Sequence, residues 1–194
     1  MIETYYRFLR HDPEGRLVKD TSLIPSHSYV IQFLEMFAAI WSRSDKNATD
    51  VNGAEGVLVD VSEYASKFFR VNGGLGNDTY GVVVGTNAGT MAEDNENYAL
   101  DTKILHDGAG AAGKLNYQAT AVVAPHVDGA SVDLHVSRTF RNETGVTITV
   151  KEIGIIIKNT DDVKYHLILR DVVSDEDVLD GETLTVIYTL RSTA

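Results

Sequence analysis

The feature that most constrains the fold is a two-residue alternation of apolar and polar side chains, which runs from residue 79 to the C-terminus. Segments such as SVDLHVSRTF and TLTVIYTL place every second residue on one face, and Gly, Asn and Asp separate these segments. Alternation of this kind is typical of strands that bury one face. The pattern predicts a mainly β protein, with an antiparallel β-sandwich, jelly-roll-like or Ig-like, over residues 77–194.

The same alternation predicts which side chains point into the core. The expected inward residues are Leu115, Tyr117, Ala119, Ala121, Val132, Leu134, Val136, Tyr165, Leu167, Leu169, Leu184, Val186, Tyr188 and Leu190. Asp133, His135 and His166 lie on the opposite phase and are expected to face outward. The run GVVVG at 81–85 reads as a strand that is buried on both faces.

One segment, TITVKEIGIIIK, changes phase in its middle. The apolar residues before the change are Ile148 and Val150, and those after it are Ile153, Ile155 and Ile157. A β-bulge at Lys151 and Glu152 would return the later residues to the core, and Gly154 would permit the tight local geometry. The alternative is that the IGIII segment is buried on both faces. We favour the bulge.

Only one segment near the N-terminus has helical periodicity. Its apolar residues are Val30, Phe33, Leu34, Phe37, Ile40 and Trp41. This spacing predicts an amphipathic helix near 28–42, for which Ser26 or Ser28 can act as the N-cap. The apolar stripe is expected to pack on the sandwich or on a neighbouring subunit.

The residues before this helix contain short apolar clusters around a turn signal, DPEG, at 12–15. They predict either two short strands joined by that turn or an extended arm. Tyr5, Tyr6 and Phe8 favour association over exposure to solvent. We therefore expect residues 1–76 to form an N-terminal arm and helix for docking and oligomerisation, followed by the β-sandwich domain at 77–194.

The charge balance and the absence of cysteine exclude several classes of function. The chain has 17 Lys and Arg against 28 Asp and Glu, a net charge of −11, which argues against nucleic-acid and polybasic membrane binding. Without cysteine there are no disulfides, thiolate metal sites or cysteine nucleophiles. We also expect neither a secretory signal nor a transmembrane segment, because no suitable apolar run is present.

The glycines and histidines predict no ligand site. Gly108, Gly110 and Gly113 match GxGxxG, but the residues after them alternate as a strand, whereas a dinucleotide site needs a helix there. The six histidines are His11, His27, His106, His126, His135 and His166. None forms a short metal-binding motif, so no local metal cluster is expected, although a trimer axis could bring histidines of three chains together.

Acidic residues gather at 93–96 and at 175–182. The second group lacks the order of ligands in an EF-hand, so solvated turns are the expected role and a calcium site is the alternative. No G-x-S-x-G sequence or other catalytic constellation occurs. The sequence therefore predicts no catalytic, cofactor-binding or metal site, and a protein that is not an enzyme.

The C-terminal half carries a further pattern: SRTFRNETGVTITVKEIGIIIKN, then LILRDVV, then GETLTVIYTLR. It resembles a recurrent pattern of tailed-bacteriophage virion proteins, R-T-F-x-N-x-[ST]-G-x-x-I-T-V-x-E-I-G, L-I-x-R-D-V and G-x-T-L-x-V-x-Y-T. The segments GVVVGTNAG, NYALDTKI and SYVIQFLEMFAAIWS resemble the same group. The resemblance covers about residues 15–190, and its motifs are structural rather than catalytic.

The resemblance implies a non-enzymatic structural component of a bacteriophage virion, in the tail or fibre apparatus. A capsid-surface decoration protein is the first alternative, and a receptor- or glycan-binding adhesin is the second. The implied partners are copies of itself, with a trimer first, and other phage virion proteins; an adhesin would also bind a host-surface glycan. No cofactor, nucleic acid or membrane is implied. The implied location is the virion exterior, after synthesis in the host bacterial cytoplasm.

Several residues of this pattern have expected architectural roles. Arg138 and Glu152 are expected to pair across neighbouring strands, and the turn at 142–145 is expected to close a hairpin. The pair at 170–171 should end a strand, and 181–183 should begin the last one. Trp41, the only tryptophan, lies on the helical stripe, which favours a structural role over sugar binding.

Overall fold

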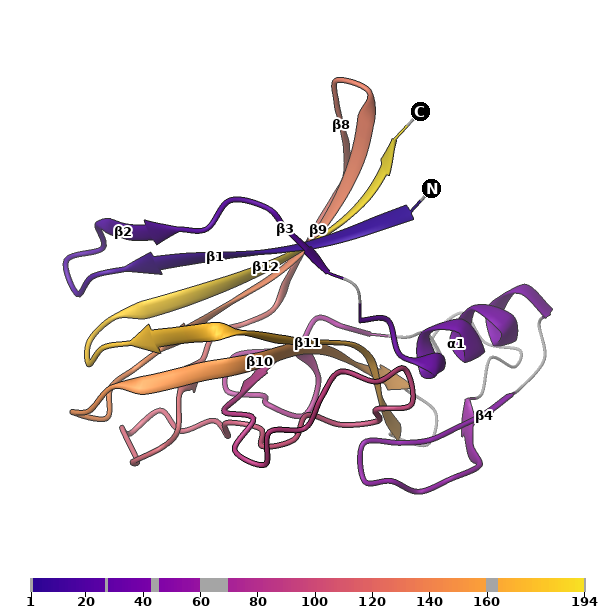
Figure 1. Cartoon of the computed structure of the whole chain (residues 1–194), viewed down its shortest axis with the longest axis horizontal. Helices are drawn as coiled ribbons and strands as arrows, with labels where there is room; N and C mark the ends of the chain where they lie inside the picture. Colours follow the sequence, from indigo (N-terminus) through magenta and orange to yellow (C-terminus); the bar gives the residue numbers. More distant parts are fainter. Residues whose placement is uncertain (1, 27, 43–45, 60–69, 160–163, 194) are drawn as a thin grey trace.

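The computed structural model describes residues 2–26, 28–42, 46–59, 70–159 and 164–193. They form a mainly β protein with antiparallel sheets and one short helix, which confirms the predicted class (Figure 1). The elements are β1 (Ile2–His11), β2 (Leu17–Asp20), β3 (Ile24–Ser26), α1 (Ile31–Ser42), β4 (Lys46–Ala48), β5 (Val57–Val59), β6 (Gly81–Gly85), β7 (Asn116–Tyr117), β8 (Ala121–Asp128), β9 (Ser131–Arg141), β10 (Ile148–Asn159), β11 (Lys164–Val178) and β12 (Thr183–Thr193).

The larger sheet, sheet A, joins the two ends of the chain. Its order is β2-β1-β12-β9-β7, with β3 paired to β1 and β8 paired to β9. The first strand pairs with the last along its whole length, from Ile2 opposite Ser192 to His11 opposite Thr183. Strand pairing thus crosses the boundary suggested between 1–76 and 77–194. The turn at 12–15 joins β1 to β2, so the hairpin forms and not the extended arm.

The smaller sheet, sheet B, has the order β11-β10-β6. The register of β10 and β11 shifts between Val150 and Glu152, where the bulge was predicted, but the extra residues lie on β11, between Val172 and Glu176. Every residue of β10 from Glu152 to Ile157 is buried. Because β10 is the middle strand and the β11 side chains beside it are also buried, the IGIII segment is buried on both faces, as the alternative stated.

Side chains of sheet A reach strands of sheet B, and the core lies between them. The Tyr188 hydroxyl on β12 donates to the Asp171 carboxylate on β11 at 2.9 Å. Tyr117 and Phe140 pack edge to face with ring centroids 4.7 Å apart. The following predicted inward residues are buried: Leu115, Tyr117, Val136, Leu167, Leu169, Leu184, Val186 and Tyr188.

Several predictions about strand faces are wrong. Asp133, expected to be exposed, is buried, and Ala121, expected in the core, is exposed. His166, expected to face solvent, is fully buried, because β11 is covered on both sides. Val132, expected in the core, is 42% exposed. It lies in the β8–β9 hairpin of residues 121–137, called the arm, which extends away from sheet B with the end of β12 paired to β9 beside it (Figure 1). All eight residues of β8 are exposed.

The connections also differ from the predicted ones. The 142–145 turn links β9 of sheet A to β10 of sheet B, so it joins two sheets and does not close a hairpin. Strand β11 continues past Arg170 and Asp171 to Val178, whereas the last strand begins at Thr183 as predicted.

Helix α1 forms at the predicted place, but it buries a different face. Gln32, Met36 and Ala39 are buried, whereas Leu34 and Ile40 of the predicted stripe are 66% and 48% exposed. The helix start is fixed by its backbone, because the N–H of Ile31 donates to the Asn95 carbonyl at 2.7 Å. Part of the predicted apolar stripe lies on the outer side of the helix.

The remaining elements are small. Strands β4 and β5 form a separate two-stranded sheet. Among the residues described, no helix is long and apolar enough to cross a membrane.

Candidate functional site

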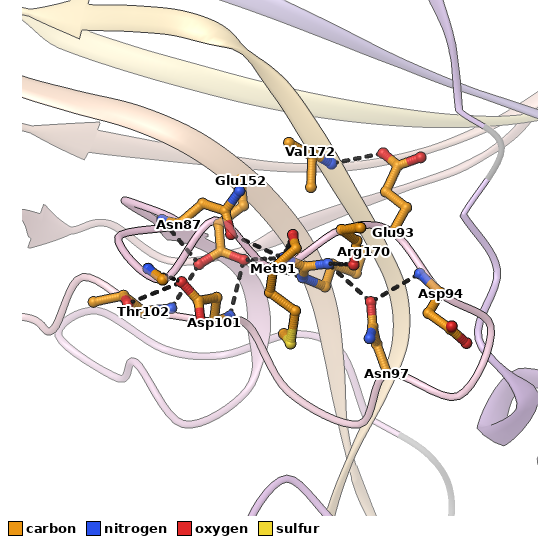
Figure 2. Close-up of polar contacts among 12 residues, drawn as sticks. Asn87, Met91, Glu93, Asp94, Asn97, Asp101, Thr102, Glu152, Arg170 and Val172 are labelled. Carbon is orange, nitrogen blue, oxygen red and sulfur yellow. Dashed lines mark hydrogen bonds and ion pairs between the residues drawn. The ribbon is translucent and has the colours of Figure 1, made fainter.

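A buried ion pair organises the long loop between β6 and the 104–117 region (Figure 2). Arg170 on β11 and Glu152 on β10 are 1% and 0% exposed, and the Arg170 Nε donates to Glu152 Oε2 at 3.0 Å. The Glu152 carboxylate also accepts the backbone N–H groups of Asn87 at 3.3 Å, Asp101 at 3.0 Å and Thr102 at 2.8 Å. One side chain therefore holds both ends of the 87–102 loop.

The Arg170 guanidinium binds the middle of the same loop. It donates to the carbonyls of Met91 at 3.0 Å and Ala92 at 2.9 Å, and to the side-chain oxygens of Asn87 at 3.2 Å and Asn97 at 2.8 Å. With the bond to Glu152, these contacts use all five N–H groups of an arginine. The ion pair and these hydrogen bonds hold the loop in place, and no donor of Arg170 remains for a ligand.

Arg138 does not pair with Glu152, so this prediction is wrong. It lies on β9 in sheet A, whereas Glu152 lies in sheet B. The Arg138 guanidinium is surrounded by backbone carbonyls: Gln118 at 2.6 Å, Gly74 at 3.0 Å, Tyr80 and Val82 both at 3.2 Å, and Asn77. Burial lowers the pKa of Arg138 to about 10, which leaves it charged at neutral pH.

A third buried centre contains Asp171, whose carboxylate accepts the hydroxyls of Ser26 at 3.0 Å and Tyr188 at 2.9 Å. Burial raises the pKa of Asp171. A carboxyl group with a raised pKa is a usual mark of a catalytic acid, but it must reach its substrate. Asp171 is only 2% exposed, so its contacts support a structural role that joins β3, β11 and β12.

The first acidic group, 93–96, is exposed around a turn, as predicted, whereas the second group departs from the predicted solvated turn in part. Glu176 and Glu182 are buried and form ion pairs with Arg10, and Lys19 also contacts Glu176. The other carboxylates of the second group also accept protein donors: Asp175 from Lys151, Asp177 from Thr149 and Asp180 from the Gly145 N–H. In the first group, Glu93 accepts the backbone N–H of Val172 at 2.7 Å. These carboxylates face protein donors rather than a common cation position.

The GxGxxG segment forms a tight loop ahead of strand β7, as its sequence context predicted. Gly110 and Gly113 have φ of 81° and 73°. A Cβ on Gly110 would overlap the carbonyl oxygen of Glu143, so this glycine permits close packing of two loops. The segment does not begin a helix, which a pyrophosphate site of this type requires.

The structure brings together three potential metal ligands that have no short motif in the sequence. His126 on β8 lies directly opposite Asp133 on β9, and His135 lies two residues further along β9. Their nearest ligand atoms all lie within 4.8 Å of one another. The signal that could have found them is Gly129, which can begin a two-residue hairpin loop at 129–130; this loop pairs Asp128 with Ser131 and thus His126 with Asp133.

The other histidines are spread over the fold. His11 ends β1, and the His106 Nδ1 accepts the Tyr117 N–H at 3.1 Å. His27 lies outside the described residues. His166 is buried, with its Nδ1 3.1 Å from the carbonyl oxygen of Thr49 and its Nε2 without a partner among the described residues.

The burial of His166 predicts an acid sensitivity. Desolvation is the main cause that lowers its pKa, while Lys164 lowers it further and the Thr49 carbonyl and Asp50 oppose the shift. Because the unfolded chain then binds more protons, stability falls as the pH drops below about 6.5, by about 1.4 kcal/mol for each unit of pKa difference.

The substitution His166→Asn is expected to reduce this loss, because Asn can keep a donor toward Thr49 and does not titrate. Urea unfolding at about pH 7.5 and pH 5 measures the difference in the free energy of unfolding. The control His11→Asn, at the edge of β1, should lose as much stability on acidification as the parent. An equal loss in His166→Asn would contradict the prediction.

Two groups of apolar side chains on the surface are candidates for contacts with other proteins. One is a groove of about 350 Å³ between the start of β1 and helix α1, lined by Ile2, Tyr29, Phe33, Leu34, Phe37 and Ala38. The other is the arm, where Val122, Val123, Val127 and Val132 are 42–76% exposed. Exposed apolar surface of this kind is common at contacts between proteins.

The comparisons with known proteins identify no relative of this chain. The chain matches no protein-family model, and neither the curated proteins nor the solved structures give a match.

Proposed function

We propose that this protein is a non-enzymatic structural component of a bacteriophage virion that assembles as a homo-oligomer, with a trimer as the first expectation. The identity as a virion protein rests on the resemblance of its C-terminal strands to the phage pattern. The proposal of assembly rests on the exposure of the arm, in which every residue of β8 is exposed.

The arm is poorly suited to remain alone in water. Within the arm β9 is also paired with β12, so β8 is the outer strand, and all its residues are exposed. An uncovered edge strand of this kind can pair with another chain. Val127 and Val132 are direct cross-strand partners near its tip and are 76% and 42% exposed. A second copy of the chain would cover these side chains and the edge of β8.

The buried centres fit a scaffold. Arg138 and Arg170 use their donors on backbone and side-chain oxygens of two long segments, 74–82 and 87–97. These contacts give irregular segments a fixed shape, which an assembly protein needs for its surfaces. With them we assign sheets A and B to the β-sandwich, jelly-roll-like or Ig-like, expected from the sequence.

The location follows from the resemblance, which favours the tail or fibre apparatus over the capsid surface. For the adhesin alternative, the structure offers a groove of about 610 Å³ beside β10 and β11. Its lining contains the Lys151–Asp175 ion pair and no aromatic side chain among the described residues on which a sugar could stack. We therefore place the adhesin last.

The assembly proposal predicts that charges on the arm abolish oligomerisation. In light scattering at micromolar concentration, the parent chain should be an oligomer and the double variant Val127→Lys/Val132→Lys a monomer. The control Val18→Lys/Val146→Lys adds the same charge at valines that are 48% and 55% exposed outside the arm, and it should stay oligomeric. A monomeric parent, or an arm variant that remains assembled, would refute the proposed interface.

The virion proposal is tested on purified particles. Quantitative mass spectrometry should find the protein at tens of copies or fewer per particle for a tail site, in a multiple of the oligomer number. Of the order of a hundred copies or more would indicate capsid decoration, and absence from the particles would refute the proposal. Saturable binding on a glycan array would instead favour the adhesin.

A further inference from the structure

We propose that His126, Asp133 and His135 bind one divalent transition-metal ion, Zn²⁺ in the first place, on the outer face of sheet A near the tip of the arm. The site would join β8 to β9 within one chain. This inference concerns the chain's own ligands and is independent of the proposed virion function.

The strand geometry places all three side chains on one face. Residues 133 and 135 share a face because side chains alternate along β9, and His126 lies directly opposite Asp133 in the register. The two imidazole rings are 5.1 Å apart between centroids. This face is the opposite of the one that carries Tyr188 into the core, since β12 presents Thr189 and Arg191 beside the cluster.

Neighbouring groups orient two of the three ligands. The Nδ1 of His135 is 2.9 Å from the buried Thr189 hydroxyl, so a proton on Nδ1 leaves the Nε2 lone pair for a metal. The Asp133 carboxylate receives Arg191 Nε at 2.7 Å and Nη2 at 2.6 Å. Each Asp133 oxygen has a further lone pair, which can bind the ion from the side away from Arg191.

The ligand set selects the class of ion. Two imidazoles and one carboxylate suit Zn²⁺ and related transition-metal ions, whereas Ca²⁺ and Mg²⁺ prefer sets made of oxygen. Zn–N bonds of about 2.0–2.1 Å in tetrahedral geometry place ligand atoms about 3.3 Å apart. The present separations, up to 4.8 Å, therefore have to shorten. His126 is exposed on an edge strand and can supply this movement by rotating its side chain.

A metal here would reinforce a weak point of the arm. The β8–β9 register is irregular between Val123 and His126, where β8 has one extra residue and contains Pro125. The interruption removes ladder hydrogen bonds next to the cluster. An ion held by His126 from β8 and by two β9 residues would replace the lost cross-strand link.

The test is isothermal titration of the full chain with ZnCl₂, with Co²⁺ as a spectroscopic probe of the ligand geometry. We expect one ion per chain and ligand-field absorption of bound Co²⁺. His126→Gln and His135→Gln should each weaken binding by at least ~100-fold, because they remove a ligand. His11→Gln, at the other end of sheet A, should bind as the parent does. Circular dichroism shows whether each variant is folded.

Two further results would overturn the site. One is the absence of saturable binding up to about 1 mM Zn²⁺, or binding that persists in both His126→Gln and His135→Gln. The other is loss of binding in Val127→Lys/Val132→Lys, which keeps all three ligands, because it would place the ligands between copies of the chain. Binding of one ion by a monomeric form of that variant supports the site, whatever the state of assembly.

Discussion

Replacing Arg170 with Met is expected to lower the free energy of unfolding by about 3–5 kcal/mol, because removal of one partner leaves a buried charge uncompensated. Glu152 would remain at 0% exposure with three backbone N–H groups but without its cation. The carbonyls of Met91 and Ala92 would lose their donor as well. Urea unfolding monitored by circular dichroism measures the change.

The matched control is Lys151→Met on the neighbouring part of β10. Lys151 pairs with Asp175 at 3.0 Å, and both side chains are largely exposed, at 42% and 65%. Such a pair contributes up to about 1 kcal/mol, so the control should be nearly as stable as the parent. Hydrogen exchange should also show the 87–102 segment losing protection in Arg170→Met and not in the control. Equal stability of the two variants would show that the buried pair does not hold the loop.

The strands could be predicted from the sequence because each carries its own periodicity. β12 alternates Leu184, Val186 and Tyr188 inward, and all three are buried. The same logic failed for His166, because alternation reports which residues can be exposed and not whether a second layer covers them. For the arm, the prediction was wrong in the opposite sense. Val132 continues the inward phase of β9 but is exposed, because the strand extends beyond the layer that would bury it.

Pairing between distant residues could not be predicted from local patterns. Arg138 and Glu152 were recognised as charges embedded in strands, and both are buried. Their partners depend on which sheet each strand joins, and the topology places β9 in sheet A and β10 in sheet B. Arg170 was recognised only as a strand end, although it is the partner of Glu152. The histidine pair was missed for the same reason, since its ligands meet through hairpin register and not through a short motif.

Substitution of Arg138 by Met is expected to have an effect of at least 4 kcal/mol, large enough to leave part of the chain unfolded, given that domains of this size are stable by about 5–15 kcal/mol. The guanidinium satisfies carbonyls of Gly74, Asn77, Tyr80, Val82 and Gln118. Each buried acceptor left without a donor costs about 1–3 kcal/mol, and water can reach only some of them.

Arg141→Met provides the control on the same strand, three residues away, because Arg141 is exposed and its only ion pair in the described chain, with Glu143, spans 3.4 Å. It should change stability by less than about 1 kcal/mol. Arg138→Lys separates charge from geometry: an ammonium keeps the charge, but its three donors cannot reach five carbonyls arranged around a planar group. We expect Arg138→Lys to be destabilised almost as much as Arg138→Met. Full stability of Arg138→Lys would mean that the charge alone holds the 74–82 segment. If the hydrogen bonds to the five carbonyls hold it, both Arg138 variants should have a much lower free energy of unfolding than Arg141→Met.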